Sequence, residues 1–334
     1  MSIHPAKLVE NVLDLASLEQ VPIRVGFGEG LVLAGDADSN VVGLCADLTE
    51  STKMDAFAKK YPERFVEMGV AEQNLASVAS GMAAMGKVPF ISSYAMFSPG
   101  RNWEQIRTTI CYNNQHVIIA GSHAGVSVGP DGATHQAIED IAIMRVIANM
   151  TVLTPCDVHE ARKATIAAAT YPGPVYIRLA REKTPVFTTL DTPFTIGKAE
   201  IFFKPSMAVE AAIVACGSLV HNALLAAGEL ERAGVGVMVV NNPSVKPFDE
   251  ETIVSAAREA GAVVTVEEHQ ITGGLGAAVA ETLARNYPVP MEFIGVQNRF
   301  GESGEPNELI EKFGMGVSSI RSAVERVIAR KEKK

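Results

Sequence analysis

The chain has 334 residues, of which 47% are hydrophobic and 20% charged, and its formal net charge is −9. A chain of this size can bury a substantial core and allows about two domains. A basic run occurs only in the final Arg-Lys-Glu-Lys-Lys334, which favours a solvated helix end over a nucleic-acid contact. No apolar run approaches the roughly 20 residues that a bilayer span requires.

Cysteine usage indicates a reducing compartment. Cys45, Cys111, Cys156 and Cys216 lie far apart without paired spacing, which argues against a disulfide framework or a metal cluster. The N-terminal segment lacks the features of an export signal. We therefore expect a cytoplasmic protein.

The first predicted elements are two helices and a buried strand. Residues 6–20 are expected to form a helix, and a Gly-rich helix follows Arg24 and ends near residue 35. Residues 41–46 form a continuous apolar run, which is typical of a parallel strand covered on both faces. This strand ends at Asp47.

The stretch 65–85 is expected to place an acidic residue at the start of a buried helix. A short apolar run at 65–70 is followed by Glu72 and then by small and apolar residues on nearly every face. A buried acid can exchange a proton with a partner base. The alternative is a first-turn acid that the helix dipole stabilises, and position alone does not decide between them.

Helices and strands continue to alternate to residue 190. Strands are expected at 88–92, 116–120, 151–154 and 174–179, and helices at 101–113, 134–149 and 157–171, the last capped by Asp157. Between them, the polar loop 122–135 is too long for a minimal connection, which favours a functional loop. Ligands of parallel sheets bind beyond the carboxyl ends of the strands, where residues 47–52 and Glu72 would lie.

A second α/β unit is expected after a linker. Prolines and short polar runs at 191–206 indicate a connection between a first domain, 1–190, and a second, 207–334. The second domain has strands at 209–216, 236–240, 262–266 and 291–295. Its run Gly273-Gly-Leu-Gly lacks the full dinucleotide pattern, so close helix packing is favoured over phosphate binding.

Candidate site residues are acids, histidines and aromatics. Neither a catalytic serine elbow nor a metal-ligand run is present, which argues against metal hydrolysis. Tyr94 and Phe97 lie three residues apart and could present two rings along one pocket wall. The alternative is that both rings pack beneath the helix that starts at Arg101.

Four motifs, in this order and spacing, resemble one known family. They are Met68-Gly-Val-Ala-Glu-Gln-Asn74, Ser93-Tyr-Ala-Met-Phe97, Gly129-Pro-Asp-Gly-Ala-Thr-His-Gln-Ala-Ile-Glu139 and Leu153-Thr-Pro-Cys-Asp157. The chain resembles the pyrimidine-binding and C-terminal domains of transketolase over nearly its whole length. The resemblance implies an α/β fold with two doubly wound domains, the larger binding the pyrimidine and the smaller holding a mostly parallel sheet.

The resemblance also implies a cofactor and a reaction. Transketolases bind thiamine diphosphate and transfer a two-carbon ketol unit from a ketose phosphate to an aldose phosphate, as in the pentose phosphate pathway. Glu72 would bond the pyrimidine ring nitrogen and favour the imino tautomer that removes the thiazolium proton. Tyr94, where the family usually has phenylalanine, and Phe97 would hold the ring, with Asp47 and Leu48 as further cofactor contacts.

The remaining site residues would bind the sugar. By motif, His123 and His135 match catalytic positions, with His135 near the reacting oxygen, and His123 and Asp131 match substrate contacts. The positions that grip the sugar phosphate are matched by Arg24, Ser51 and Arg181, where a guanidinium fork suits a dianion. Outside this context, such arginines would be solvated charges and the serine a turn residue.

The half of the family that holds the diphosphate is missing from this sequence. Its Gly-Asp-Gly motif, which binds the metal and the diphosphate, has no counterpart, and Gly35-Asp-Ala-Asp38 lacks the second glycine. The resemblance therefore implies a split transketolase with no metal ligand in this chain. A partner N-terminal subunit would supply the diphosphate and Mg²⁺ domain, in a heterotetramer of two plus two chains.

Three alternatives share these features. A deoxyxylulose-phosphate synthase fragment would have an arginine where Ser122-His123-Ala124 stands. The beta subunit of a 2-oxo acid dehydrogenase usually lacks the Gly-x-Asp-Gly-x-Thr-His loop. An orphaned non-catalytic module is disfavoured by the retention of Glu72, Asp131 and His135.

Overall fold

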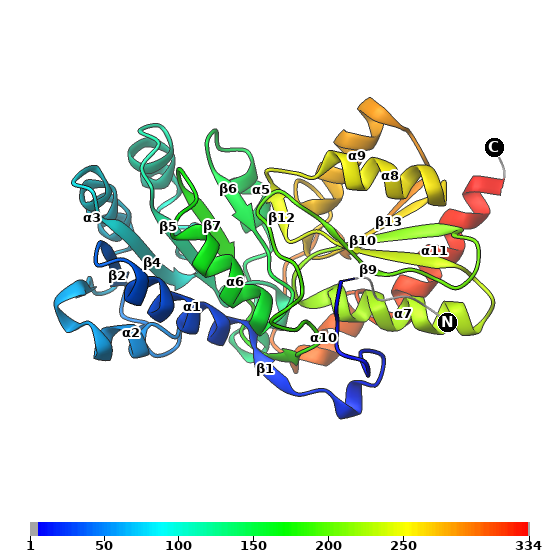
Figure 1. Cartoon of the computed structure of the whole chain (residues 1–334), viewed down its shortest axis with the longest axis horizontal. Coiled ribbons are helices and arrows are strands. Elements are labelled where there is room, and N and C mark those ends of the chain that lie inside the picture. Colours follow the sequence, from blue (N-terminus) through cyan, green and yellow to red (C-terminus); the bar gives the residue numbers. More distant parts are fainter. Residues whose placement is uncertain (1–5, 333–334) are drawn as a thin grey trace.

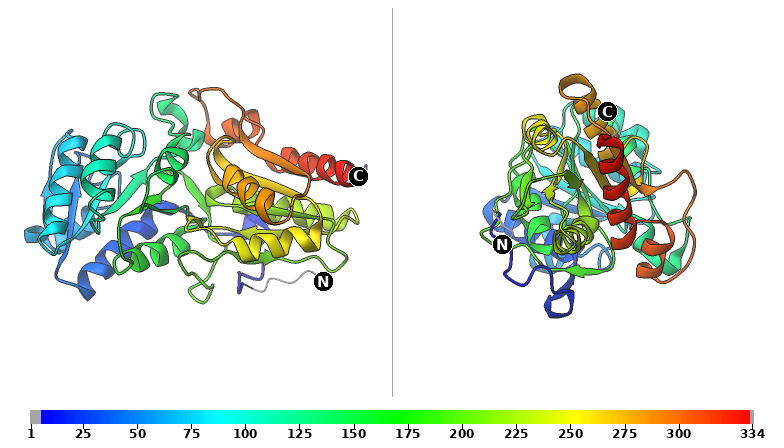
Figure 2. Two further views of the ribbon diagram at one scale, coloured as in Figure 1. Left: turned by 90° about the horizontal axis from the view of Figure 1, so that it is seen from above. Right: turned by 90° about the vertical axis from the view of Figure 1, so that its right-hand side faces the viewer.

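Continuous apolar runs form the strands of two separate sheets, which stand side by side along the long axis of the molecule (Figures 1 and 2). The computed structural model describes residues 6–332. The larger sheet has seven strands in the order β12-β6-β7-β5-β4-β2-β3. These strands are β2 (Val41–Cys45), β3 (Phe65–Glu67), β4 (Val88–Tyr94), β5 (Ile118–Ser122), β6 (Thr151–Leu153), β7 (Val175–Arg178) and β12 (Ser244–Lys246).

Helices cover both faces of this sheet, because alternate strand residues point to opposite sides. In β2, Val41 and Cys45 belong to the core beneath one helix layer, whereas Val42 and Leu44 belong to the core beneath the other. The first layer is α1 (Ile23–Ala37) and α6 (Val158–Ala168). The second is α3 (Glu72–Ala84), α4 (Trp103–Gln105), η3 (Ile106–Cys111) and α5 (Asp140–Arg145).

The smaller sheet has five strands in the order β14-β13-β10-β11-β9, all parallel except β9. Its strands are β9 (Glu200–Phe203), β10 (Ala211–Ala215), β11 (Val237–Asn241), β13 (Val263–Gln270) and β14 (Met291–Val296). The surrounding helices are α7 (Val220–Arg232), α8 (Glu250–Ala260), α9 (Leu275–Asn286), α10 (Pro306–Lys312) and α11 (Val317–Glu332). The two mostly parallel sheets confirm the predicted fold class.

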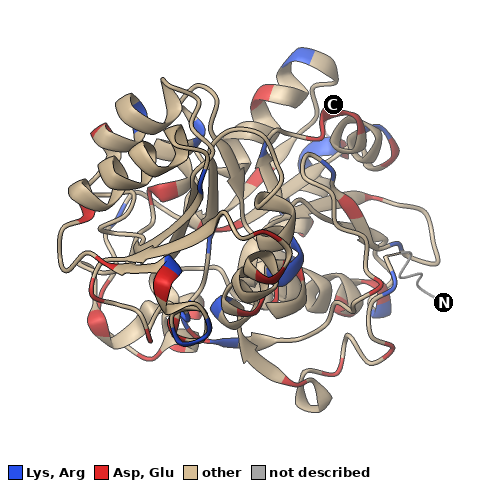
Figure 3. Cartoon of the chain, turned by 60° about the vertical axis from the view of Figure 1, so that its left-hand side comes forward, with Lys and Arg blue, Asp and Glu red and all other residues tan. Residues whose placement is uncertain are grey.

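Charged side chains lie mainly on the helices and loops around these sheets. Figure 3 shows lysines and arginines interspersed with acids over this periphery, while most of the strands carry neither. The four cysteines are free and buried. Within the described part of the chain, no helix is long and apolar enough to cross a membrane.

The predicted N-terminal helix at 6–20 is wrong. Only the short turn η1 (Leu15–Ser17) is helical there, and β1 (Gln20–Pro22) pairs with β8 (Lys183–Pro185). The reason is tertiary packing, because Val12 and Leu18 are buried in the core of the smaller domain. The segment lies beside α7 in Figure 1, where the Val12 carbonyl is 2.8 Å from His221 Nε2.

Two further helices differ from their predicted form. The helix expected at 101–113 is split into α4 and the π-helical η3, and the helix expected at 134–149 is reduced to α5. Strands β9 and β12 were not predicted. β9 lies inside the expected linker, and β12 crosses from the second half of the sequence to pair with β6 in the larger sheet.

The glycine run at the start of α9 packs closely against β13, as predicted. Backbone N–H groups of Leu275 and Gly276 each donate to the Glu267 carboxylate at 2.7 Å. A Cβ at Gly274 would lie 2.0 Å from Glu267 Oε2. The chain's own buried carboxylate therefore occupies this helix N-terminus.

Buried polar contacts connect the two domains. Arg178 at the end of β7 pairs with Asp140 at 2.9 Å and donates to the Glu268 carbonyl of β13 at 2.7 Å. Glu268 Oε1 in turn accepts from the backbone N–H of Ser127, in the loop that follows β5. The smaller domain thus supports the long polar loop of the larger one.

Candidate active site

Five neighbouring parallel strands of the larger sheet end at the same edge, and each is followed by predicted site residues. Their order across the sheet is β3, β2, β4, β5 and β7. The residues at or after these strand ends are, in that order, Glu72, Asp47, Tyr94, His123 and Arg181. Strand-end residues on one edge of a parallel sheet form the usual ligand crevice of this architecture.

Glu72 is the first residue of α3 and is only 2% exposed. Its Oε2 accepts a hydrogen bond from Arg101 Nη1 at 2.7 Å, and its backbone carbonyl accepts from Asn102 Nδ2 at 3.0 Å. The small residues of α3 let the helix pack closely on the sheet. Glu72 is therefore held in place by hydrogen bonds to its side chain and to its backbone carbonyl.

Four aromatic rings form a second cluster, which Arg101 connects to Glu72 by lying over the Phe97 ring. The Tyr94 and His123 rings stack with centroids 3.8 Å apart, and Phe97 meets His135 edge-on at 5.4 Å. Tyr94 and Phe97 are nearly parallel at 6.3 Å. The predicted pair thus forms a continuous wall with both histidines of the long loop, and His123 covers one face of Tyr94.

His123 is held as a neutral imidazole. It is 2% exposed, has a φ of +56°, and its Nδ1 lies 2.9 Å from Ser122 Oγ. Burial, followed by the charges of Arg24 and Arg181 and by His135, lowers the pKa of His123 from 6.5 to about 3. At neutral pH the ring can accept or donate a hydrogen bond but carries no charge.

The three residues predicted to hold the sugar phosphate lie in one connected group. Arg24 at the start of α1 donates from Nε to the Arg181 carbonyl at 3.1 Å and from Nη1 to the Ser51 carbonyl. Arg181 Nη1 donates to the Val128 carbonyl at 2.6 Å and lies 3.8 Å from Asp131. Burial and the nearby Arg181 lower the pKa of Arg24, which indicates that the two cations are close enough to repel each other.

The Glu67 side chain supports the end of strand β2. Asp47 has a φ of +60°, and its backbone N–H donates to Glu67 Oε1 at 2.7 Å. The Leu48 carbonyl accepts a hydrogen bond from the Thr52 backbone N–H at 2.9 Å. The Leu48 side chain is partly buried. The Asp47 side chain is exposed, so it is free to face a ligand or a partner.

Sequence reasoning missed Arg101 and Glu67. Arg101 was assigned only to the start of a helix, and Glu67 only to a strand. Arg101 reaches Glu72 across 29 positions of the sequence, and Glu67 reaches Asp47 across 20. No local spacing indicates either contact, because both arise from the side-by-side placement of strand ends.

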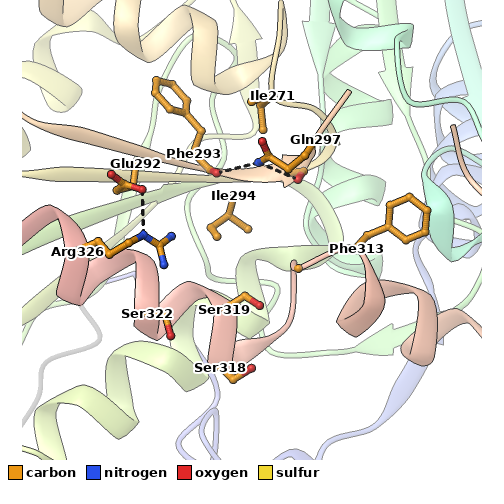
Figure 4. Close-up of a pocket in the computed structure, with 12 residues that line it drawn as sticks. Ile271, Glu292, Phe293, Ile294, Gln297, Phe313, Ser318, Ser319, Ser322 and Arg326 are labelled. Carbon is orange, nitrogen blue, oxygen red and sulfur yellow. Dashed lines mark hydrogen bonds and ion pairs between the residues drawn. The ribbon is translucent and has the colours of Figure 1, made fainter. Parts of the chain in front are cut away.

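One cavity of the smaller domain lies away from these residues. A cavity of about 560 Å³ lies in the smaller domain between β14 and α11 (Figure 4). Its arginine, Arg326, already pairs with Glu292 at 3.2 Å. Within residues 6–332, no group of three or more His, Cys, Asp or Glu side chains is placed to hold a metal ion.

Family comparison agrees with this geometry. Residues 19–186 match the model of the transketolase pyrimidine-binding domain, and residues 204–320 match that of the transketolase C-terminal domain. The chain belongs to the transketolase family.

Several relatives that this chain covers almost completely are named as sections or subunits of a transketolase. A Methanocaldococcus jannaschii protein named for a transketolase C-terminal section is 42% identical over 90% of this chain and 95% of its own length. The 6-deoxy-6-sulfo-D-fructose transketolase subunit SqwH of a Clostridium species is 39% identical, covering 94% and 97%. A solved structure, described as a split gene transketolase, inactive beta4 tetramer, has a TM-score of 0.86 and 44% identity over 93% of this chain and 99% of its own.

Proposed function

We propose that this chain is the pyrimidine-binding and C-terminal subunit of a two-chain, thiamine-diphosphate-dependent transketolase. The observation that carries the proposal is the buried Glu72 carboxylate at the common edge of five parallel strands, joined to the Phe97 ring through the Arg101 guanidinium. An aminopyrimidine needs both a carboxylate for its ring nitrogen and an aromatic face for its plane.

The residues present fit one half of the cofactor. Glu72 and Phe97 offer the carboxylate and the apolar face that suit an aminopyrimidine. The sequence lacks the Gly-Asp-Gly motif that holds the diphosphate and its metal in this family. A partner chain is proposed to supply that motif, which agrees with the split-gene organisation of the relative of known structure.

In the proposed mechanism, Glu72 bonds the ring nitrogen of the pyrimidine and holds a proton there. Thiamine diphosphate, when bound, supplies the carbon nucleophile for ketol transfer. The wall formed by Tyr94, Phe97, His123 and His135 shields the reacting groups from water. Neutral His123 can hydrogen-bond a substrate oxygen without adding charge.

The anionic end of the substrate is assigned to Arg24, Ser51 and Arg181. The two guanidinium groups are close enough to affect one another, and an anion between them would relieve their repulsion. The positive charge of the two guanidinium groups suits the phosphate of a sugar phosphate. A sulfonate, as in the substrate named for the Clostridium relative, presents similar oxygens to the same group.

Co-purification with the partner chain, followed by a ketol-transfer assay, tests the proposal. The complex should convert xylulose 5-phosphate and ribose 5-phosphate, or a sulfosugar donor in a parallel reaction, in the presence of thiamine diphosphate and Mg²⁺. The preferred donor identifies the substrate class. A complex that binds the cofactor and transfers no ketol unit from either donor would contradict the assignment.

A further inference from the structure

Arg101 makes two contacts that connect the proposed pyrimidine-binding residues. Its Nη1 lies 2.7 Å from Glu72 Oε2, and its guanidinium carbon lies 4.8 Å from the centroid of the Phe97 ring. One side chain therefore occupies both the carboxylate and an aromatic face. These are the two groups that the proposed function assigns to the cofactor ring.

The chemistry of the guanidinium group explains how Arg101 can contact both Glu72 and Phe97. It is planar, carries N–H donors along its edge, pairs with carboxylates and stacks on aromatic rings. An aminopyrimidine bound to Glu72 and Phe97 would use the same donor edge and the same flat face. Arg101 thus resembles the cofactor ring in shape and in hydrogen bonding.

The two partners of the ion pair differ strongly in exposure. The Glu72 side chain is 2% exposed, whereas the Arg101 side chain is 47% exposed. A buried carboxylate without a partner is costly, so Glu72 benefits from a cation when no ligand is bound. The exposed Arg101 can move into solvent at little cost, because its charge is already partly hydrated.

We propose that Arg101 is an internal stand-in for the cofactor pyrimidine, which satisfies Glu72 in the unloaded subunit and must move aside when the ring binds. This inference rests on the proposed function. Arg101 acts through Glu72 and Phe97 in the unloaded subunit and would not contact the bound ring. Arg101 competes with the pyrimidine ring for Glu72 and Phe97. The apparent affinity for the cofactor is therefore lowered, because only molecules with Arg101 displaced can bind the ring.

Removing the competitor should tighten binding. In the two-chain complex, Arg101→Met keeps much of the side-chain length but removes the charge and the donors. Its dissociation constant for thiamine diphosphate, measured with Mg²⁺ by isothermal titration calorimetry, should fall at least about fivefold, because the ion pair that the ring must break has an exposed cation but a buried carboxylate. Calorimetry reports binding without reference to turnover.

Two variants control the measurement. Arg101→Lys retains a charge for Glu72 but lacks the planar fork, so its affinity should lie between those of the wild type and Arg101→Met. It also provides the test if Arg101→Met fails to fold. Arg107→Met makes the same change at an exposed arginine in the adjoining η3 and should leave the affinity unchanged.

The outcomes separate this inference from the proposed function. Equal or weaker binding by Arg101→Met would overturn the stand-in role, since it would show that Arg101 stays with Glu72 or supports the bound ring. If Arg101→Met does not fold, equal or weaker binding by Arg101→Lys would do the same. Failure of the wild-type complex to bind thiamine diphosphate would instead contradict the proposed function.

Discussion

At the scale of single residues, burial determines the chemistry of the proposed site. Glu72 and His123 are each 2% exposed, yet they are stabilised in opposite ways. Glu72 is paired with the cation Arg101, whereas His123 is near the cations Arg24 and Arg181 and loses its proton. His123 is therefore neutral, whereas Glu72 is stabilised by its ion pair.

The lowered pKa of His123 predicts a pH-dependent stability. Between about pH 3 and 6.5 the unfolded chain binds this proton and the folded chain does not, so the free energy of unfolding falls as the pH is lowered through this window. The contribution is up to about 1.4 kcal/mol per pH unit. Urea unfolding of the wild type and of His123→Asn between pH 4.5 and 7 measures it.

His123→Asn should show a shallower dependence, because asparagine tolerates the positive φ but does not titrate. His159→Asn, on α6, serves as the control and should retain the wild-type slope. Identical slopes for all three proteins would contradict the assignment of a buried neutral histidine.

The proposed phosphate contacts of Arg24, Ser51 and Arg181 predict that KM depends on the substrate phosphate. Arg181→Ala or Ser51→Ala in the complex should raise KM at least about tenfold for a phosphorylated ketose, the scale of a lost charge-assisted hydrogen bond. KM for an unphosphorylated ketose should change much less. Steady-state kinetics with both donors provide the comparison, and equal increases for the two donors would count against a phosphate contact.

Sequence motifs predicted most residues of the candidate site, but they did not predict which of these residues contact one another. Tyr94, Phe97 and His135 lie in short motifs, and the structure brings them together. Arg101 could not be assigned because its contact with Glu72 depends on the positions of α3 and α4 beside the sheet edge. Side-chain pairing across the fold leaves no periodic signal in the sequence.

At the scale of elements, the buried parallel strands were predictable, whereas the short antiparallel strands and the helix ends were not. The runs that became β2, β4 and β5 are apolar on both faces, which few other structures permit. The first 20 residues have a weakly helical pattern, but packing of Val12 and Leu18 against the smaller domain overrides it. Strand β12 is short, and its pairing partner lies about 90 positions earlier, so no local pattern identifies it.

The N-terminus of α9 provides a stability test. Glu267→Gln should lower the free energy of unfolding by about 1–3 kcal/mol, because an amide oxygen can replace only one of the two carboxylate acceptors. Urea denaturation measures the change. Glu251→Gln, an exposed acid in the first turn of α8, should change stability by less than about 0.5 kcal/mol. Similar values for the two variants would contradict the buried-anion interpretation.

At the scale of the whole molecule, the two domains share one framework. Arg178, Asp140 and Glu268 connect the sheets, and Glu268 also supports the loop that contains Asp131. The second chain proposed to carry the diphosphate domain would meet this chain at the sheet edge that holds Glu72 and the aromatic wall. The proposed enzyme would therefore be completed by assembly with that chain, together with the displacement of Arg101 from Glu72.

The rate of ketol transfer by the reconstituted complex, with Glu72 or with Glu72→Gln, tests the central claim most directly. Glutamine preserves the shape of the side chain but cannot hold the proton on the pyrimidine nitrogen, so turnover should fall by about three orders of magnitude or more while calorimetry still detects cofactor binding. The unmixed chain should show no transfer. A Glu72→Gln complex with near-normal turnover would contradict the account.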